Sequence, residues 1–105
     1  MADFKIRLTL LAASMLSECP KQVRKKAKDK IDGLSTNPDQ QGRPLKGKLF
    51  GFRRIVCAGR YRIIYHVCTE ETMTTVVAVG IRKEGDKNNI YTVATKIAEK
   101  GDLLS

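Results

Sequence analysis

A chain of 105 residues, 42% of them hydrophobic, can build one modest core but not two, so we expect a single domain, 1–105. Its 20 Lys and Arg residues outnumber 11 Asp and Glu residues, and the net charge of +9 favours nucleic acid as a partner. The alternative is that the charge maintains solubility or is neutralised by an acidic protein. No apolar run is long enough for a membrane span, so no membrane partner is expected.

The cysteines and the N-terminal segment both favour a cytoplasmic location. Cys19, Cys57 and Cys68 are odd in number and form no CxxC pair, which is typical of reduced thiols. We therefore expect no disulfide framework, no metal site and no cofactor. Residues 5–16 place two basic residues before an apolar run, as a secretory signal does, but the acidic Asp3 and a strand-like alternation fit such a signal poorly.

The first third of the chain predicts a strand and two helices. Apolar and polar residues alternate from Asp3 to Leu10, which is the period of a half-buried strand. Residues 11–35 predict a helical hairpin that breaks near Cys19-Pro20. The second helix has a buried stripe formed by Val23, Ala27, Ile31 and Leu34. Its opposite face is strongly basic and includes Lys25 and Lys28, which either dock on RNA or are simply solvated.

Three closely spaced strands and a last helix make up the rest of the chain. The strands are predicted at about 49–58, 61–68 and 73–82, and the third is apolar on both faces, as a central strand should be. Asn88 or Asn89 can cap a helix with apolar residues at helical spacing, which Lys100 and Gly101 close. These elements predict an α+β fold, with an antiparallel four-stranded sheet packed against the N-terminal helical hairpin and a short C-terminal helix.

A two-residue turn at Gly59-Arg60 predicts which side chains share a face of the sheet. Glycine at the first turn position suits a type II′ hairpin turn, and such a turn fixes the register. The expected opposed pairs are Ala58–Tyr61, Cys57–Arg62, Ile55–Ile64 and Arg53–His66. Since opposed residues share a face, Arg53, Arg62 and His66 should lie together. The other side is apolar enough to receive the helical hairpin, with Arg54 its one charged residue.

Several segments of the sequence resemble the RelE/ParE toxins. Residues 42–47, Gly-Arg-Pro-Leu-Lys-Gly, resemble the family's loop before its second strand, and residues 58–65 resemble its Gly-x-Tyr-Arg-x-x-Tyr hairpin. Residues 79–83 followed by Ile90-Tyr91 are similar to the end of its fourth strand and a C-terminal tyrosine. Together with Lys21-Gln22-Val23-Arg24 in the second helix, the resemblance covers nearly the whole chain. It implies the toxin half of a toxin–antitoxin pair, with a cognate antitoxin as partner.

The resemblance implies two activities from different classes. RelE-type members cleave messenger RNA in the ribosomal A site, whereas ParE-type members poison DNA gyrase. We expect the first, a metal-independent endoribonuclease, because the residues that match its site are retained. These are Arg53, Arg62, Arg82 and Tyr91. The alternatives are a ParE-type gyrase poison and an inactive RNA-binding homologue.

Arginine suits such a site because it stays charged and its fork matches two oxygens of a phosphorane. The chain departs from the RelE pattern in two places, which leaves the general base open. Ile55 stands where RelE carries a second lysine, and the interval from Arg82 to Tyr91 is longer. Tyr91 either stacks on a base and handles a proton or only packs its helix.

Other polar residues are candidates for binding or are ordinary surface groups. Arg43, Lys46 and Lys48 are expected to grip flanking phosphates or ribosomal RNA, or to be plain loop charges. His66, the only histidine, has the pKa range for acid–base work, but its distance along the strand from Arg62 favours a partly buried structural role.

Overall fold

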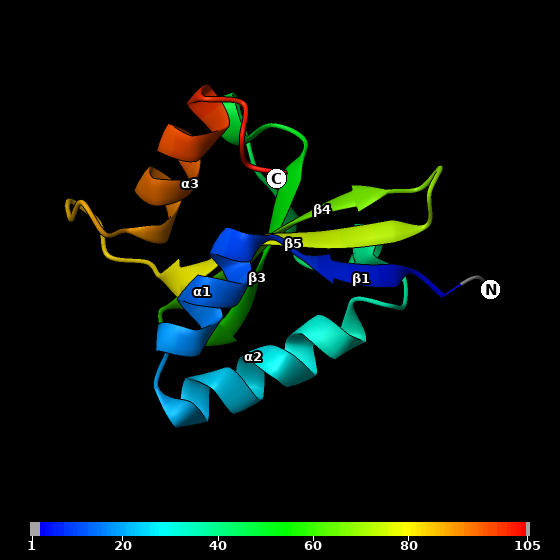
Figure 1. The fold of residues 1–105 in the computed structure, drawn as a ribbon, viewed down its shortest axis with the longest axis horizontal. Coiled ribbons are helices and arrows are strands. Elements are labelled where there is room, and N and C mark those ends of the chain that lie inside the picture. The colour runs from blue at the N-terminus through cyan, green and yellow to red at the C-terminus, as the bar shows by residue number, and fades with distance from the viewer. Residues whose placement is uncertain (1–2, 105) are drawn as a thin grey trace.

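The computed structural model describes residues 3–104, which form a mixed five-stranded sheet flanked by helices (Figure 1). The strands lie in the order β1-β5-β4-β3-β2, and β1 pairs with β5 in parallel while the other neighbours are antiparallel. In chain order they are β1 (Lys5–Leu8), β2 (Arg43–Pro44), β3 (Phe52–Ala58), β4 (Tyr61–Cys68) and β5 (Met73–Ile81). The helices are α1 (Leu10–Glu18), α2 (Lys21–Gly33) and α3 (Ile90–Glu99), with short 3-10 turns η1 (Pro38–Gln40) and η2 (Gly47–Leu49).

The prediction of an α+β fold with an N-terminal helical hairpin and a C-terminal helix is confirmed, but the sheet differs from the expected one. It has five strands rather than four, because the two residues of β2 pair with Arg53 and Arg54 of β3. It is also mixed rather than wholly antiparallel, because β1 runs parallel to β5. Alternation in a sequence reveals a strand and its faces, but not its partner or direction.

The helices follow their sequence signals closely. The Thr9 hydroxyl begins α1 by accepting a hydrogen bond from the Ala12 N–H at 3.1 Å. The chain breaks at Cys19-Pro20, and α2 then buries Ala27 and Ile31, two residues of the expected stripe. Asn89 precedes α3 but does not cap it with its side chain, since its amide oxygen accepts the Lys83 N–H instead.

Each face of the sheet carries its own apolar cluster. On the first face, here the α1/α2 face, Ile63, Tyr65 and Val76 pack with residues of α1 and α2. On the second, here the α3 face, Ile64 and Val77 pack with residues of η2, α3 and the C-terminal segment. The buried members contributed by those segments are Leu49, Ile90, Ala94 and Leu103. Any residue of β3, β4 or β5 therefore points either toward the helical hairpin or toward α3.

A β-bulge in β3 overturns most of the expected hairpin register. Ala58 faces Tyr61 as expected, but the pairing shifts by one residue between Val56 and Ala58. The observed pairs beyond the shift are Val56–Arg62, Ile55–Ile63, Arg54–Ile64, Arg53–Tyr65 and Phe52–His66. The expected pairs Cys57–Arg62, Ile55–Ile64 and Arg53–His66 are therefore wrong. A slip of one residue moves every later side chain to the other face, so Arg53 and Arg54 exchange sides.

The bulge has a packing reason. Cys57 and Ala58 both belong to the cluster on the α1/α2 face, and Cys57 is only 7% exposed. Its Sγ lies 3.8 Å from the Val23 carbonyl oxygen of α2. Two consecutive residues can pack on one face only where the alternation of the strand is interrupted. The extra residue thus allows the core under α2 to be filled. It also changes which arginine lies on the α3 face, from Arg53 to Arg54.

A buried tyrosine anchors the loop that carries β2 to the sheet. Tyr65 is fully buried, and its hydroxyl lies 2.9 Å from the Pro38 carbonyl oxygen and 2.7 Å from that of Gln41. Burial raises the pKa of the phenol, against a smaller lowering by Arg53. Tyr65→Phe should therefore lower the free energy of unfolding by about 1–2 kcal/mol, because the buried Pro38 carbonyl group loses its donor, whereas the Gln41 carbonyl keeps Arg53.

Urea unfolding followed by circular dichroism measures this loss. Tyr61→Phe, on the same strand and the same face, is the matched control and should change stability by less than about 0.5 kcal/mol. Equal stability of the Tyr65→Phe variant and the parent chain would show that this loop is held without the hydroxyl.

Candidate functional site: a basic surface on the α3 face

Three arginines form a stripe on the α3 face of the sheet. Arg43 of β2 is directly opposite Arg54 of β3, and Arg54 shares its face with Arg62 of β4, because Arg54 pairs with Ile64 and Val56 with Arg62. Within residues 3–104, none of these three guanidinium groups forms an ion pair with a carboxylate. Like charges held together without counter-ions make a surface that attracts polyanions.

Arg62 is held at the turn end of this stripe. Its Nη1 donates to the carbonyl oxygens of Gly59 at 2.8 Å and Tyr61 at 3.1 Å. Its Nε is buried and has no hydrogen-bond partner among the described residues. A buried N–H without a protein partner is costly.

Glycine at position 80 makes room beside Arg62. Gly80 pairs with Arg62 across β4 and β5, and a Cβ there would lie 3.0 Å from Cδ1 of Ile90 and 3.3 Å from Cε of Met15. The missing side chain lets the first turn of α3 approach the strand closely. The close approach fixes Tyr91, the next residue of α3, near the end of β5.

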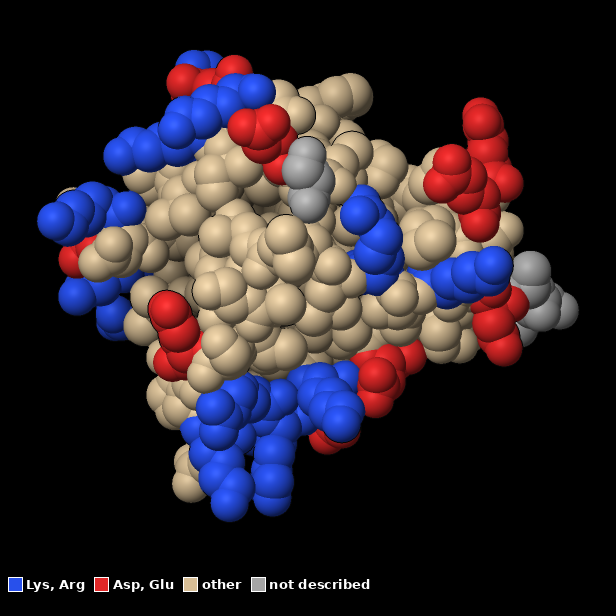
Figure 2. All heavy atoms as spheres, in the orientation of Figure 1, with Lys and Arg blue, Asp and Glu red and all other residues tan. Residues whose placement is uncertain are grey.

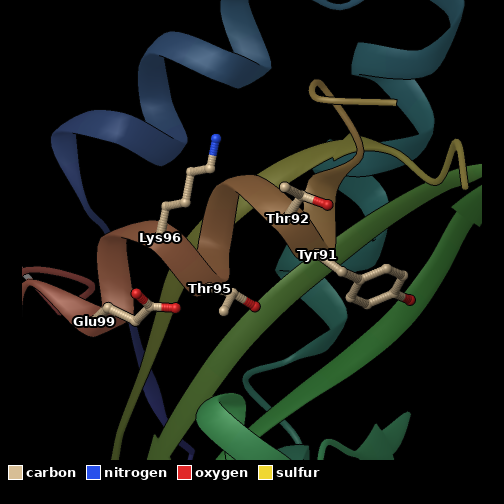
Figure 3. Close-up of a pocket in the computed structure, with 5 residues that line it drawn as sticks. All are labelled: Tyr91, Thr92, Thr95, Lys96 and Glu99. Atoms are coloured by element: carbon tan, nitrogen blue, oxygen red, sulfur yellow. The ribbon is translucent and has the colours of Figure 1, made fainter. Parts of the chain in front are cut away.

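Arg82 and Tyr91 both lie near that end of the sheet. Arg82 follows β5 directly, and its guanidinium pairs with the Glu84 carboxylate, which raises the pKa of Arg82 and lowers that of Glu84. Figure 3 shows the Tyr91 ring extending from α3 toward the strands, and it packs against the cluster on the α3 face. Arg62, Arg82 and Tyr91 thus gather at the turn end of one face.

A shallow pocket lies beside Tyr91. Its volume is about 360 Å³, and Tyr91 and Thr92 line one end of it (Figure 3). The other end is lined by Thr95, Lys96 and Glu99. Glu99 is also the partner of Lys48, whose Nζ lies 2.8 Å from its Oε1. An aromatic ring that forms the wall of an open pocket is accessible for stacking on a nucleobase.

Arg53 is not part of this surface. It pairs with Tyr65 and points to the α1/α2 face, where its Nε donates to the Gln41 carbonyl oxygen at 3.0 Å and its Nη2 to that of Gly42 at 3.3 Å. The expectation that Arg53 and Arg62 share a face is therefore wrong. Its contacts give Arg53 a structural task, since it holds the loop before β2.

The other candidate residues fall into separate places. Arg43 lies on β2, Lys46 directly precedes η2, and Lys48 lies on η2. All three are exposed around the α3 face. Lys25 and Lys28 belong to α2, which packs on the opposite face and carries the dense basic patch at the bottom of Figure 2. The chain thus has two basic surfaces on different sides of the sheet.

His66 shares a face with Arg54 and Arg62 but lies at the far end of β4 from Arg62. Its ring packs against that of Phe52 in a tilted arrangement, with ring centroids 5.5 Å apart. Its packing fits the expected structural role.

Sequence reasoning missed Arg54, although a signal for it was present. Adjacent residues of a strand point to opposite faces, so one of Arg53 and Arg54 had to join Arg62 whatever the register. It also missed that Arg60 and Lys83 line a pocket of about 500 Å³ together with Arg82 and Glu84. Pocket walls formed by a turn and a loop far apart in sequence carry no periodic signal.

Two further features of residues 3–104 concern membranes and metals. None of their helices combines the length and the apolar composition that crossing a bilayer requires. No group of three His, Cys, Asp or Glu side chains among them is arranged to hold a metal ion.

Comparison with known proteins places the chain in a family. Residues 6–85 match the family model for the ParE toxin of type II toxin–antitoxin systems, parDE. No curated protein sequence matches the chain. Solved structures of toxins match it along most of its length, at sequence identities that reach 26% among those compared below.

Three of these structures illustrate the likeness. The toxin–antitoxin complex RelBE2 of Mycobacterium tuberculosis matches with a TM-score of 0.70 and 26% identity over 78% of this chain and 94% of the other. The isolated E. coli toxin RelE matches with a TM-score of 0.67 and 21% identity over 89% and 96%. The YoeB–YefM complex of Staphylococcus aureus gives 0.61 and 17% over 78% and 100%. With the family match across the sheet and both N-terminal helices, this chain belongs to the RelE/ParE superfamily of toxins of type II toxin–antitoxin systems.

Proposed function

We propose that the chain is an endoribonuclease toxin that cleaves messenger RNA in the ribosomal A site and so inhibits translation. The observation that carries the proposal is the surface formed by Arg54, Arg62, Arg82 and Tyr91 on the α3 face. It has three guanidinium groups and an accessible phenol, which suit a phosphodiester with a flanking base.

The residues can divide the chemistry of metal-independent cleavage among them. The 2′-OH of the RNA attacks the adjacent phosphorus, so charge builds up on the phosphorane oxygens and the 5′-oxygen must leave. Arg62 lies at the turn end of the α3 face without a carboxylate partner among the described residues, and Arg82 has an exposed ion pair that an anion can replace. We assign these two arginines to the phosphorane, Arg54 to the approach of the scissile phosphate, and Tyr91 to a base or a proton.

RelE carries a second lysine at the position of Ile55, and in this chain Arg54 supplies a positive charge on β3 in its place. Ile55 faces the α1/α2 cluster, so a lysine in its place would point into the core. Val56 pairs with Arg62, and Arg54 precedes Val56 by two positions. The bulge therefore places Arg54 on the same face of the sheet as Arg62. We therefore propose Arg54, and no longer Arg53, as the catalytic arginine of β3.

The family match favours a second candidate, a ParE-type poison of DNA gyrase. The matched model is named for ParE and ends at residue 85, before α3 and Tyr91. A gyrase poison would keep the fold but would not need Arg54, Arg62 and Tyr91 as a set. An inactive RNA-binding homologue would keep the arginines and lack turnover.

A cognate antitoxin is the expected protein partner. We propose, from the charge of the α3 face, that the antitoxin binds there. RelBE2 and YoeB–YefM are toxin–antitoxin complexes. On this chain the unpaired arginines of the α3 face would attract an acidic segment at a high rate. Such a segment would cover Arg62 and Arg82 or take the place of α3.

Brief induction of the toxin without its antitoxin should stop protein synthesis before it affects DNA. Incorporation of labelled methionine is expected to fall within minutes, and primer extension on an abundant messenger should show new 5′ ends in register with the reading frame. A supercoiling assay with purified gyrase serves as the parallel measurement. Normal incorporation together with trapped gyrase–DNA complexes would decide for the ParE-type activity.

A further inference from the structure

A second polar site lies where the β3–β4 turn meets the segment after β5. It is a pocket of about 500 Å³ lined by Arg60, Arg82, Lys83 and Glu84. The backbone holds its two sides together, since the Arg82 N–H donates to the Arg60 carbonyl oxygen at 2.8 Å and Tyr61 pairs with Ile81. The pocket is therefore built on the sheet and does not depend on the contacts of its side chains.

The charges in this pocket are unbalanced. Three cationic side chains face one carboxylate, and that carboxylate, Glu84, is bound by Arg82. Lys83 has a long contact with Asp86, with Nζ 3.4 Å from Oδ2. Arg60 has no carboxylate partner within residues 3–104. The Glu84 carboxylate thus already binds Arg82, whereas the guanidinium of Arg60 in the same pocket binds no carboxylate of the described residues.

We propose that this pocket binds a backbone phosphate of RNA and that Glu84 occupies Arg82 until the phosphate displaces it. The choice of RNA rests on the function proposed above, whereas the phosphate site rests on the pocket itself. A phosphodiester carries the same single charge as the Glu84 carboxylate and likewise offers two oxygens to the arginine fork. It also gains Arg60, which no internal group satisfies.

Displacement of Glu84 is easy because the pair is exposed. The side chains of Arg82 and Glu84 are 48% and 75% exposed, and ion pairs in such surroundings contribute little to stability. Once RNA is bound, the pocket phosphate takes the place of Glu84 on Arg82 and lies beside Arg60. Glu84 thus serves as an internal competitor that keeps the free site closed to weaker anions.

Binding of an RNA that cannot be cleaved tests the proposal. The probe is a 2′-O-methyl RNA hexanucleotide at low salt, which lacks the attacking hydroxyl, and affinity is measured by fluorescence anisotropy over a series of salt concentrations. Arg60→Ala should weaken binding about tenfold and reduce the salt dependence by about one phosphate contact. Glu84→Gln should tighten binding about threefold or more, because Arg82 loses its competitor.

Lys87→Ala is the matched control, since Lys87 is an exposed cation of the same loop that does not line the pocket. It should change affinity less than Arg60→Ala does. A hexaglutamate peptide in the same assay represents a protein partner. If the peptide responds to Glu84→Gln and the oligonucleotide does not, the pocket is a carboxylate site and the proposal is overturned.

The outcome separates this proposal from the proposed nuclease activity. RNA cleavage that continues while Arg60→Ala and Glu84→Gln leave affinity and salt dependence unchanged overturns the phosphate pocket alone. Oligonucleotide binding that responds as expected in a chain without any cleavage activity keeps the pocket and overturns the nuclease.

Discussion

Arg62→Ala and Arg82→Ala should each lower the rate of RNA cleavage about 10²–10³-fold while leaving the chain folded, because each removes one donor to the phosphorane. The effect on folding should be small for separate reasons. Arg82 and its partner Glu84 are exposed, and Arg62 contributes a buried Nε that has no partner within residues 3–104. Removing an unsatisfied group offsets the loss of the bonds from Arg62 to Gly59 and Tyr61.

Single-turnover cleavage on programmed ribosomes, with thermal unfolding of each variant, measures both quantities. Arg62→Lys retains the charge but not the planar fork and should recover only part of the rate. Lys5→Ala is the control, because Lys5 is an exposed cation on β1, at the opposite edge of the sheet from β2. Wild-type cleavage by both alanine variants would remove Arg62 and Arg82 from the site.

The adjacent arginines of β3 should separate catalysis from stability. Arg54→Ala is expected to reduce cleavage about 10²-fold with little change in stability, since it loses a phosphate contact on the α3 face. Arg53→Ala should instead lower the free energy of unfolding by about 1–3 kcal/mol, because its guanidinium holds the Gln41 and Gly42 carbonyl groups. Folded Arg53→Ala protein should cleave RNA at nearly the rate of the parent chain.

Each of the two variants is the control for the other, as they differ by one position and remove the same side chain. Rates are compared at a temperature where both are folded, and stability is taken from urea unfolding. A loss of cleavage in Arg53→Ala with full activity in Arg54→Ala would mean that the active surface is on the α1/α2 face. A loss of cleavage in both variants, at equal stability, would mean that arginines on both faces of β3 contribute to cleavage.

The local signals in the sequence were sufficient for most of the elements. Alternation, the Cys19-Pro20 break and the glycine turn at Gly59 each act over a few residues, and the corresponding strands, helices and hairpin are found within a few residues of their predicted bounds. The stripe of α2 also follows from helical spacing alone. The resemblance to the family suggested Arg62, Arg82 and Tyr91 as site residues, and the structure brings these three to one end of one face.

The arrangement of the sheet and the identity of the β3 arginine were decided by tertiary structure. The parallel pairing of β1 with β5 joins segments almost seventy residues apart, and no local pattern encodes that partner. The bulge arises because Cys57 and Ala58 both pack under α2, a contact that exists only once the helix lies on the sheet. The sequence alone determined that one of two adjacent arginines would share a face with Arg62. Packing of the core on the other side of the sheet selected Arg54, because an extra residue in a strand reverses the facing of every residue before it.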